Sequence, residues 1–342
     1  MSFRDFKWHL FLVLLLLLFF AAMLLRRDLG IDFYAYYHAL RWSAENGVVP
    51  YQHWSGSPIA SKNSPLAVYA HSHGDSLPLE FLYPPCAIAQ LRPFTWIAPP
   101  EGAIVLWRLF NLLVFAGTVL IAARLPGGRL DMRRAVILLL LCGAYSPLRQ
   151  GLWLGQVSPW IALLMIASVS ALQNRRSGLA GGALALATTM KIYPVLWLPM
   201  IALYPRRAWR GIAAFALVAA AIVSASLLFY GPDIWRVWYV DVFKPMLRVP
   251  PSGGISLYPF VGSSTLLPFN LQPRILNQAI LGIVLAAGAI WLLKSIGSRR
   301  ANKRRTLLAF TALLSLVMPL TWEHYLGFFG VLLAAELATR VS

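Results

Sequence analysis

One aspartate just beyond the first apolar run of the chain has the position and the surroundings of a catalytic base. Asp32 lies in the aromatic stretch 30–37, a few residues after an apolar run that ends at Leu25. A charged side chain beside a membrane segment is a candidate for function because it is costly to keep there. A carboxylate at this place could take a proton from a sugar hydroxyl that attacks an activated anomeric carbon. The alternative is that Asp32 caps the helix that follows it.

A lysine interrupts another apolar stretch, 178–205, and is followed closely by Tyr193 and Pro194. Lys191 would suit a phosphate leaving group, whose negative charge grows in the transition state. Alternatively, its long side chain reaches out to the membrane interface. Because the break falls between two short helices that we expect to form a hairpin, we favour the phosphate role.

Two further polar breaks separate apolar runs on the same expected side of the membrane. In the first, 149–156, Arg149 supplies a second cation, Trp153 a stacking face and Gln156 a hydrogen-bonding group suited to a sugar. In the second, 321–325, Glu323 and His324 could orient an acceptor. The alternatives are ordinary ones, since Trp and Arg also belong to interfacial belts and a polar break can be a simple turn.

The elements that must position these residues are membrane helices. Of the 342 residues, 59% are hydrophobic and only 12% are charged, about half the charged fraction of an average soluble domain. A chain in lipid must satisfy its own backbone hydrogen bonds, so it forms helices or a closed barrel. The apolar runs are continuous rather than alternating, as in 10–25 and 212–229. The sequence therefore predicts an all-α integral membrane protein.

Spacing and charge together predict about ten membrane segments in one domain, 1–342. A span needs about 20 apolar residues, and Lys and Arg clusters mark cytoplasmic loops. We expect a hairpin of two short helices over 178–205, a first outer loop over 26–100 with short interfacial helices, and a second outer loop over 230–272. The other expected segments are 8–25, 102–123, 135–148, 157–173, 211–229, 274–294, 306–319 and 325–339.

The acidic residues, which did not enter this assignment, sort in agreement with it. Of the 12 in the chain, only Asp5, Asp131 and Glu336 fall on the predicted inner side. Acidic residues contribute little to orientation, so this distribution also indicates where the polar chemistry lies. Those on the predicted outer side are Asp28, Asp32, Glu45, Asp75, Glu80, Glu101, Asp233, Asp241 and Glu323.

Several classes of function are disfavoured by what the sequence lacks. The net charge of +18 is spread over short clusters between apolar runs, so there is no soluble basic face for a nucleic acid. The two cysteines match no metal spacing, and no phosphate-binding loop or dinucleotide fingerprint is present. We expect no metal and no cofactor. A phosphate role without a nucleotide site points to a phosphate carried on a lipid.

Taken in order, these breaks resemble glycosyltransferase family 87, the polyprenol-phosphate-mannose-dependent mannosyltransferases of the GT-C superfamily. The resemblance implies a GT-C-type helical bundle and a metal-independent, inverting transfer from a polyprenyl-phosphate sugar at the outer face of the membrane. It also implies that Asp32 is the general base, that Lys191 and Arg149 serve the lipid phosphate, and that His324 lies near the site. The segments that carry it are 32–37, 47–51, 83–85, 155–156, 178–194 and 322–324.

These expectations define the partners and the location of the site, and they leave two rival functions. The partners would be a polyprenyl-phosphate sugar donor, a lipid or glycan acceptor and membrane lipids, with the site on the periplasmic or exterior face of the plasma (inner) membrane. The acceptor stays open, because the first outer loop carries a Pro/Ser/His-rich insert near 55–76. A transporter or lipid flippase and a non-catalytic scaffold are the rival functions. We expect substrate contacts from Tyr36, Tyr83, Gln156, Tyr193, Glu323 and His324.

Overall fold

In the residues that the computed structural model describes, every regular element is a helix, as predicted. These residues are 3–25, 30–52, 61, 63–74, 79–97, 99–125, 132–144, 151–204, 208–248 and 330–335. The expected segments 274–294 and 306–319 lie outside them, and of 325–339 only 330–335 is described, as helix. The long elements are α1 (Phe3–Leu25), α5 (Pro100–Arg124), α6 (Met132–Ala144), α8 (Ser158–Gln173), α9 (Ser177–Met190), η1 (Tyr193–Leu203) and α10 (Ala208–Val237).

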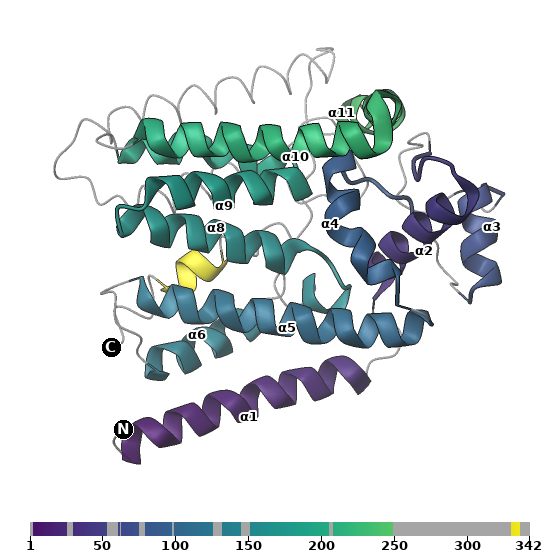
Figure 1. Ribbon diagram of the computed structural model, residues 1–342. Coiled ribbons are helices and arrows are strands. Elements are labelled where there is room, and N and C mark those ends of the chain that lie inside the picture. The colour runs from purple at the N-terminus through teal and green to yellow at the C-terminus, as the bar shows by residue number, and fades with distance from the viewer. Residues whose placement is uncertain are drawn as a thin grey trace, which may run out of the picture.

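These elements lie side by side, and the helices of the predicted outer loops gather at one end of them (Figure 1). That end is opposite to the one at which α1 begins. Within the bundle, α5 packs against α8, and α8 packs against α9. The helices of the first outer loop pack on each other and on α5, α9 and α10, which places them over the ends of the long helices. They are α2 (Ile31–Asn46), α3 (Pro65–Ser72) and α4 (Pro85–Thr95), and α11 (Lys244–Arg248) lies beside them.

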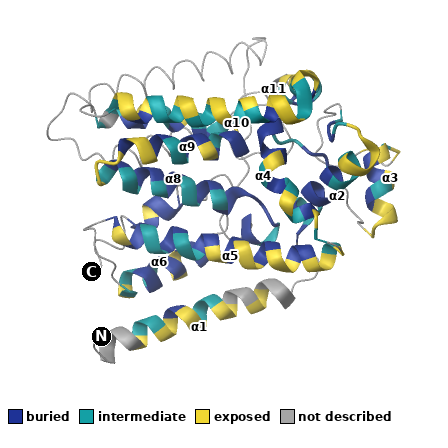
Figure 2. Ribbon diagram, in the orientation of Figure 1, coloured by how far each residue is buried: buried dark blue, intermediate teal, exposed yellow. Residues whose placement is uncertain are grey.

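The helices have the surface of a membrane protein. Among the described residues, Pro100–Arg124 and Ala208–Met246 are long and apolar enough to cross a bilayer, and several shorter helices are also apolar. Large apolar side chains on α10 face outward, including Leu228 at 86% exposure, and Figure 2 shows exposed positions along α1 and α10. Apolar exposure on this scale is unfavourable in water and favourable in lipid.

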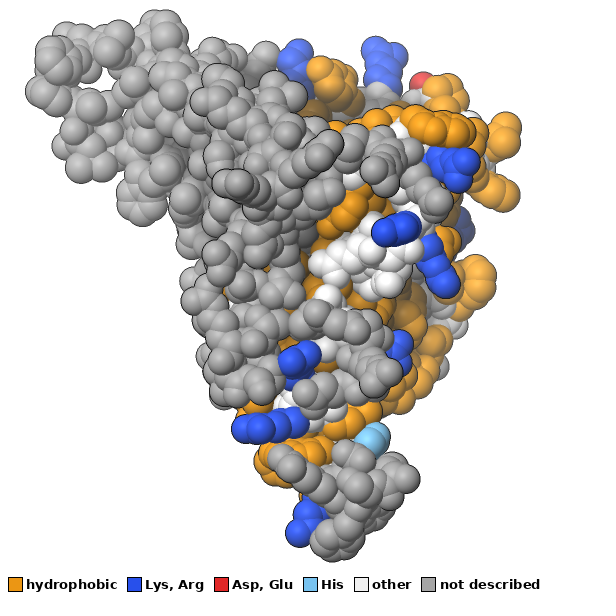
Figure 3. All heavy atoms as spheres, turned by 90° about the vertical axis from the view of Figure 1, so that its left-hand side faces the viewer, with side chains coloured by type: hydrophobic (Ala, Val, Ile, Leu, Met, Phe, Trp, Pro, Cys, Tyr) orange, Lys and Arg blue, Asp and Glu red, His pale blue; other side chains and the backbone are white. Residues whose placement is uncertain are grey.

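Basic side chains mark the end of the bundle where α1 begins. Figure 3 faces that end and shows Lys and Arg side chains distributed over it. Their helix positions agree, because Arg124 ends α5, Arg133 and Arg134 open α6, and Arg175 and Arg176 form the turn between α8 and α9. This is the distribution expected of a cytoplasmic face.

The predicted break at Lys191 is present. Helix α9 ends at Met190, Lys191 has an extended backbone with φ −142° and ψ 136°, and the chain returns along α9 as the 3-10 helix η1. Pro194 and Pro199 lie within η1, and proline removes a backbone donor and disfavours a regular α-helix. The hairpin therefore stops short on one side of the bundle and leaves Lys191 at its tip.

Close contact between small residues joins this hairpin to α10. A Cβ added at Gly181 of α9 would lie 1.9 Å from the carbonyl oxygen of Gly211 on α10, so the two backbones touch at that point. Helices in membranes approach in this way because small residues permit close van der Waals packing. Helix α10 then breaks at Gly231, with φ 76°, and the chain continues as the π-helix η3 (Trp238–Phe243) into α11. The described part of the predicted second outer loop is thus helical.

Candidate active site

The site is built on a loop between α6 and α8 that is fixed to α5 by buried hydrogen bonds. The indole of Trp107 donates to the carbonyl of Gly155 at 2.8 Å, and the amide of Asn111 donates to the carbonyl of Gln156 at 3.4 Å. Asn111 in turn accepts a hydrogen bond from the indole of Trp160 on α8 at 2.6 Å. These bonds hold the backbone of residues 155–156 against the N-terminal half of α5.

The first turn of α2 docks on this loop through its main chain. The amide of Asp32 donates to the carbonyl of Leu154 at 3.0 Å, and the ring of Phe33 lies 5.4 Å from that of Trp107. Gly155 has φ 72°, and a Cβ there would lie 2.8 Å from the Cβ of Phe33. Only glycine combines this backbone conformation with so close an approach.

The structure does not use Asp32 as a helix cap. Within the described residues, the N-cap position of α2 is Gly30, which has no side chain to cap the helix. Asp32 lies inside the first turn. A carboxylate in this position still interacts favourably with the positive end of the helix dipole. Its side chain turns instead toward Gln156 and Lys191, to which it is joined by a hydrogen bond and by electrostatic attraction.

Five of the predicted residues form one polar cluster around the side chain of Gln156. The Oε1 atom of Gln156 accepts from the ammonium of Lys191 at 3.1 Å and from the hydroxyl of Tyr83 at 3.2 Å. The hydroxyls of Tyr36 and Tyr83 share a hydrogen bond of 2.6 Å, and the Lys191 Nζ atom lies 5.1 Å from the centroid of the Tyr83 ring. Because the amide side of Gln156 bonds Asp32, one glutamine connects the predicted base to the predicted phosphate ligand.

Burial sets the chemistry of this cluster. Gln156 and Lys191 are 2% and 7% exposed, and Asp32 is half-buried. Lys191 therefore does not extend to the interface, which was its alternative role. Burial raises the pKa of Asp32 to about 6, although the hydrogen bond from Gln156 and the charge of Lys191 both act to lower it. A carboxyl group with a pKa near the working pH is suited to general base catalysis.

Not every predicted residue can be placed in the cluster. Tyr193 lies on η1, and its ring packs against Trp197 with 5.9 Å between centroids. Arg149, Glu323 and His324 lie outside the residues that the structure describes.

The sequence reasoning missed a buried arginine next to the cluster. Arg108 lies on α5, one residue after Trp107, and is 5% exposed. One of its guanidinium nitrogens is 3.7 Å from the point where a Cβ on Gly30 would stand, and the group interacts electrostatically with Tyr34. It was visible in the sequence as a charge within the expected span 102–123, a position that is costly unless the residue has a function.

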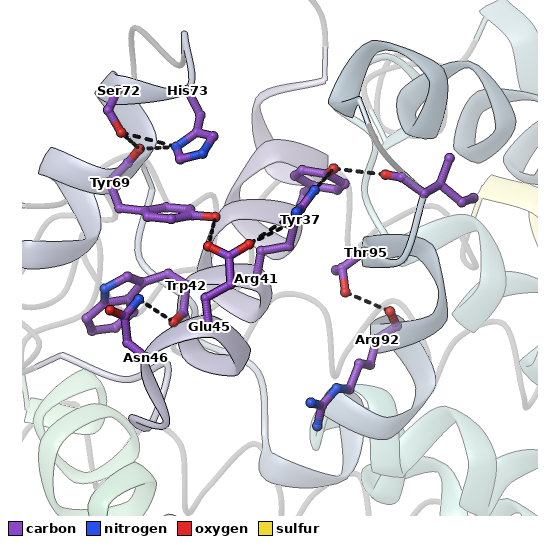
Figure 4. A network of polar contacts seen from close by, with 11 residues as sticks. Tyr37, Arg41, Trp42, Glu45, Asn46, Tyr69, Ser72, His73, Arg92 and Thr95 are labelled. Atoms are coloured by element: carbon purple, nitrogen blue, oxygen red, sulfur yellow. Dashed lines mark hydrogen bonds and ion pairs between the residues drawn. The ribbon is translucent and has the colours of Figure 1, made fainter.

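A network on the outer loop holds the helix that carries Asp32 (Figure 4). The hydroxyl of Tyr37 on α2 donates to the carbonyl of Ile97 at 2.8 Å and accepts from Arg41 at 2.9 Å. Arg41 pairs with Glu45 at 3.1 Å, and Tyr69 of α3 donates to the same carboxylate at 2.8 Å. These contacts tie the middle and C-terminal part of α2 to α3 and to the residues that follow α4, so the helix that carries Asp32 is held beyond its first turn.

One known protein family matches most of the chain. The family model of glycosyltransferase family 87 matches residues 81–322, which is most of the chain. The chain belongs to glycosyltransferase family 87. The predicted family is thereby confirmed, and membership makes the chain a glycosyltransferase, which requires a sugar donor and an acceptor. No curated protein and no solved structure matches the chain.

The family match covers only part of the cluster. Tyr83, Gln156 and Lys191 fall within the matched residues of glycosyltransferase family 87, whereas Asp32 and Tyr36 precede them. The link between the two parts is therefore the tertiary structure, in which Asp32 reaches Gln156 through the docking of α2 on residue 154.

Proposed function

We propose that this glycosyltransferase moves a sugar, mannose by its resemblance, from a polyprenyl-phosphate donor to a hydroxyl group of a lipid or glycan acceptor. The reaction takes place on the extracytoplasmic face of the plasma (inner) membrane. The observation that carries the proposal is that Asp32 and Lys191 approach the same glutamine side chain, which bonds both of them. A base and a cation held together in a buried place are the two groups that this transfer needs.

In the proposed reaction the acceptor oxygen attacks the anomeric carbon of the donor sugar while the bond between that carbon and the phosphate oxygen breaks. Asp32 takes the proton of the attacking hydroxyl. The electron pair of the broken bond leaves with the polyprenyl phosphate, whose added charge Lys191 stabilises. Attack from the side opposite to the phosphate gives inversion, and no metal is needed in this scheme because a fixed ammonium neutralises the leaving group.

Donor binding would also strengthen the base. Lys191 attracts Asp32 and thereby lowers its pKa. A phosphate that draws Lys191 toward itself weakens this attraction and adds a negative charge nearby, and both changes raise the pKa of a carboxyl group. Asp32 would then become more basic when the donor arrives. Arg108 and Arg149 are the further cations that we assign to the donor phosphate.

The test is transfer from radiolabelled polyprenyl-phosphate mannose by the purified protein in nanodiscs, with a panel of lipid and glycan acceptors. Asp32→Asn keeps the size of the side chain and removes the base, so we expect turnover to fall by about 10²- to 10⁴-fold. Donor binding should stay close to that of the wild type. Glu101→Gln is the control, because Glu101 is an exposed carboxylate in the first turn of α5 and lies outside the network that holds α2.

Two outcomes would contradict the proposal in different ways. An Asp32→Asn protein with wild-type turnover would remove Asp32 from its role as the base. A wild-type protein that neither binds nor uses the donor would argue against this donor, and a measurement of lipid-linked sugar movement across the bilayer would then test the flippase alternative.

A further inference from the structure

A second buried carboxylate near the site is not used in the mechanism above. Glu80 lies in the first outer loop and is 7% exposed, and within the described part of the chain its Oε2 atom has no hydrogen-bond partner. Asp32 differs from it, since Gln156 and Lys191 both stabilise that carboxylate. A buried polar group without a partner destabilises the fold. A ligand that supplies the missing hydrogen bond would relieve this cost.

The segment that carries Glu80 is held on two sides, so its position is defined. The ring of Phe81 lies 5.7 Å from that of Tyr51, whose hydroxyl donates to the carbonyl of Tyr83 at 2.9 Å. The indole of Trp238 on η3 donates to the carbonyl of Leu82 at 3.3 Å. The backbone of this segment is therefore held between the region around Tyr51 and the π-helix.

A second group without a partner lies on the neighbouring segment. Gln52 follows Tyr51 directly, and among the residues described its Nε2 atom is buried with no hydrogen-bond acceptor. Glu80 precedes Phe81, the ring partner of Tyr51. The contact between Tyr51 and Phe81 thus brings an amide donor and a carboxyl group into the same part of the outer loop.

Glu80 also lies within reach of a molecule bound in the candidate active site. Glu80 lies three positions before Tyr83, so their Cα atoms are at most about 11 Å apart even in a fully extended chain. Tyr83 belongs to the cluster, because its hydroxyl donates to Gln156. One or two sugar rings span a distance of this size, so an acceptor that reacts at Asp32 is long enough to reach the segment that carries Glu80.

The chemistry of Glu80 and Gln52 favours binding of the acceptor sugar over the donor phosphate. A carboxylate repels the phosphate of the donor, whereas a sugar hydroxyl can donate to a carboxyl oxygen and accept from an amide. Burial raises the pKa of Glu80 to about 7, so the group can either accept or donate a hydrogen bond near neutral pH. A sugar hydroxyl group can form a hydrogen bond with either the ionised or the protonated form of Glu80.

We propose that Glu80 and Gln52 form an acceptor subsite that binds a hydroxyl of the acceptor sugar next to the reacting hydroxyl. This inference rests on the proposed function, because it assigns the acceptor side of the same site. It adds a specificity-determining residue that takes no part in proton transfer.

The experiment compares Glu80→Leu and Glu80→Gln with the wild type in nanodiscs, with polyprenyl-phosphate mannose as donor and octyl mannoside, octyl glucoside and octyl galactoside as acceptors. For Glu80→Leu we expect the KM for the acceptor to rise at least tenfold, the KM for the donor to stay within twofold, and Tm to be unchanged or higher, because an unpartnered carboxyl group has been removed. Glu80→Gln keeps a hydrogen-bonding group and should recover part of the acceptor affinity. Glu101→Gln is again the control.

The outcomes separate this inference from the proposed function. A Glu80→Leu protein with a wild-type KM for the acceptor would overturn the subsite while leaving the glycosyltransferase reaction intact. A fall in Tm together with equal losses for donor and acceptor would show that Glu80 is structural, and would overturn it as well. A wild-type protein that transfers mannose to no acceptor would overturn both proposals.

Discussion

Asp32 has neighbours that act on its proton affinity in opposite directions. Burial raises its pKa, and the hydrogen bond from Gln156 and the charge of Lys191 lower it, with the result near 6. The side-chain oxygen of the same glutamine accepts hydrogen bonds from Lys191 and Tyr83. Gln156, which we expected to contact the sugar, therefore contacts both the proposed base and the proposed phosphate ligand in this structure.

The pH dependence of the reaction follows from this arrangement. A general base works when it has lost its proton, so kcat/KM should fall as the pH drops through about 6, the pKa of Asp32. The acid limb of kcat, which reports the donor complex, should lie at higher pH, because a bound phosphate draws Lys191 away and adds negative charge. Initial rates between pH 4.5 and 8 would check this. Identical limbs for kcat and kcat/KM would argue against coupling between the donor and the base.

Replacing Gln156 should disturb the base and the cation together. Gln156→Leu removes the hydrogen bond to Asp32 and leaves its burial, so we expect the acid limb of kcat/KM to move to higher pH and kcat/KM to fall by about 10- to 100-fold, as for loss of one or two buried hydrogen bonds. The readout is the pH–rate profile. A comparable loss of rate with an unmoved profile would limit Gln156 to a structural role.

A second glutamine supplies the matched control. Gln90 of α4 donates to the hydroxyl of Thr189 on α9 at 3.2 Å and so also joins the outer helices to the hairpin. Gln90→Leu should lower Tm slightly and leave the pH profile in place.

At the scale of the helices, the position of Lys191 depends on how α9 packs against α10. A Cβ at Gly181 would lie 1.9 Å from the Gly211 oxygen and 3.0 Å from the Phe215 amide, whereas at Gly182 the nearest atom is a methyl group of Val218 at 3.8 Å. The two adjacent glycines thus differ sharply in whether a methyl group fits at their position. Together with the packing of α9 on α8, this crossing locates the hairpin and its tip.

Gly181→Ala should therefore be destabilising and Gly182→Ala should not. The first change forces two backbones apart, and such overpacking costs about 1–3 kcal/mol, so Tm in nanodiscs should fall by several degrees. The second makes an ordinary van der Waals contact and gains helix propensity, so Tm should stay the same or rise. Equal effects at the two positions would contradict the close backbone contact.

At the scale of the whole molecule, the end that carries the cluster is opposite to the end that carries the basic turns. Helices α1, α5, α8, α9 and α10 connect the two ends, and α2, α3 and α4 cover the ends where Asp32 and Lys191 lie. By the charge rule the basic end faces the cytoplasm. The cluster would then open to the exterior or the periplasm.

Single cysteines would test this orientation. Asn63 lies in the first outer loop and Asn174 in the basic turn between α8 and α9, and both are exposed. In a chain whose buried Cys86 and Cys142 are replaced by Ala, a membrane-impermeant maleimide should label Asn63→Cys in right-side-out vesicles. Asn174→Cys should react with the maleimide only after the vesicles are permeabilised. The reverse pattern would put the candidate site on the cytoplasmic face.

The sequence by itself determined the features that depend on local order and composition. Continuous apolar runs predicted helices, because a backbone in lipid must bond within its own segment, and a lysine followed closely by proline predicted the break between α9 and η1. The same reasoning identified Asp32, Tyr36, Tyr83, Gln156 and Lys191 as separate polar interruptions, and their order along the chain indicated the family.

Only the tertiary structure decided how these residues act on one another. Asp32 and Gln156 are far apart in the chain and meet because α2 docks on residue 154, which Trp107 and Asn111 help to position from α5. The absence of a described partner for the Glu80 Oε2 atom is likewise invisible in a sequence. Burial and hydrogen bonding depend on what packs around a group, so distances between elements, rather than residue types, set the proton affinity of Asp32 and the hydrogen bonding of Glu80.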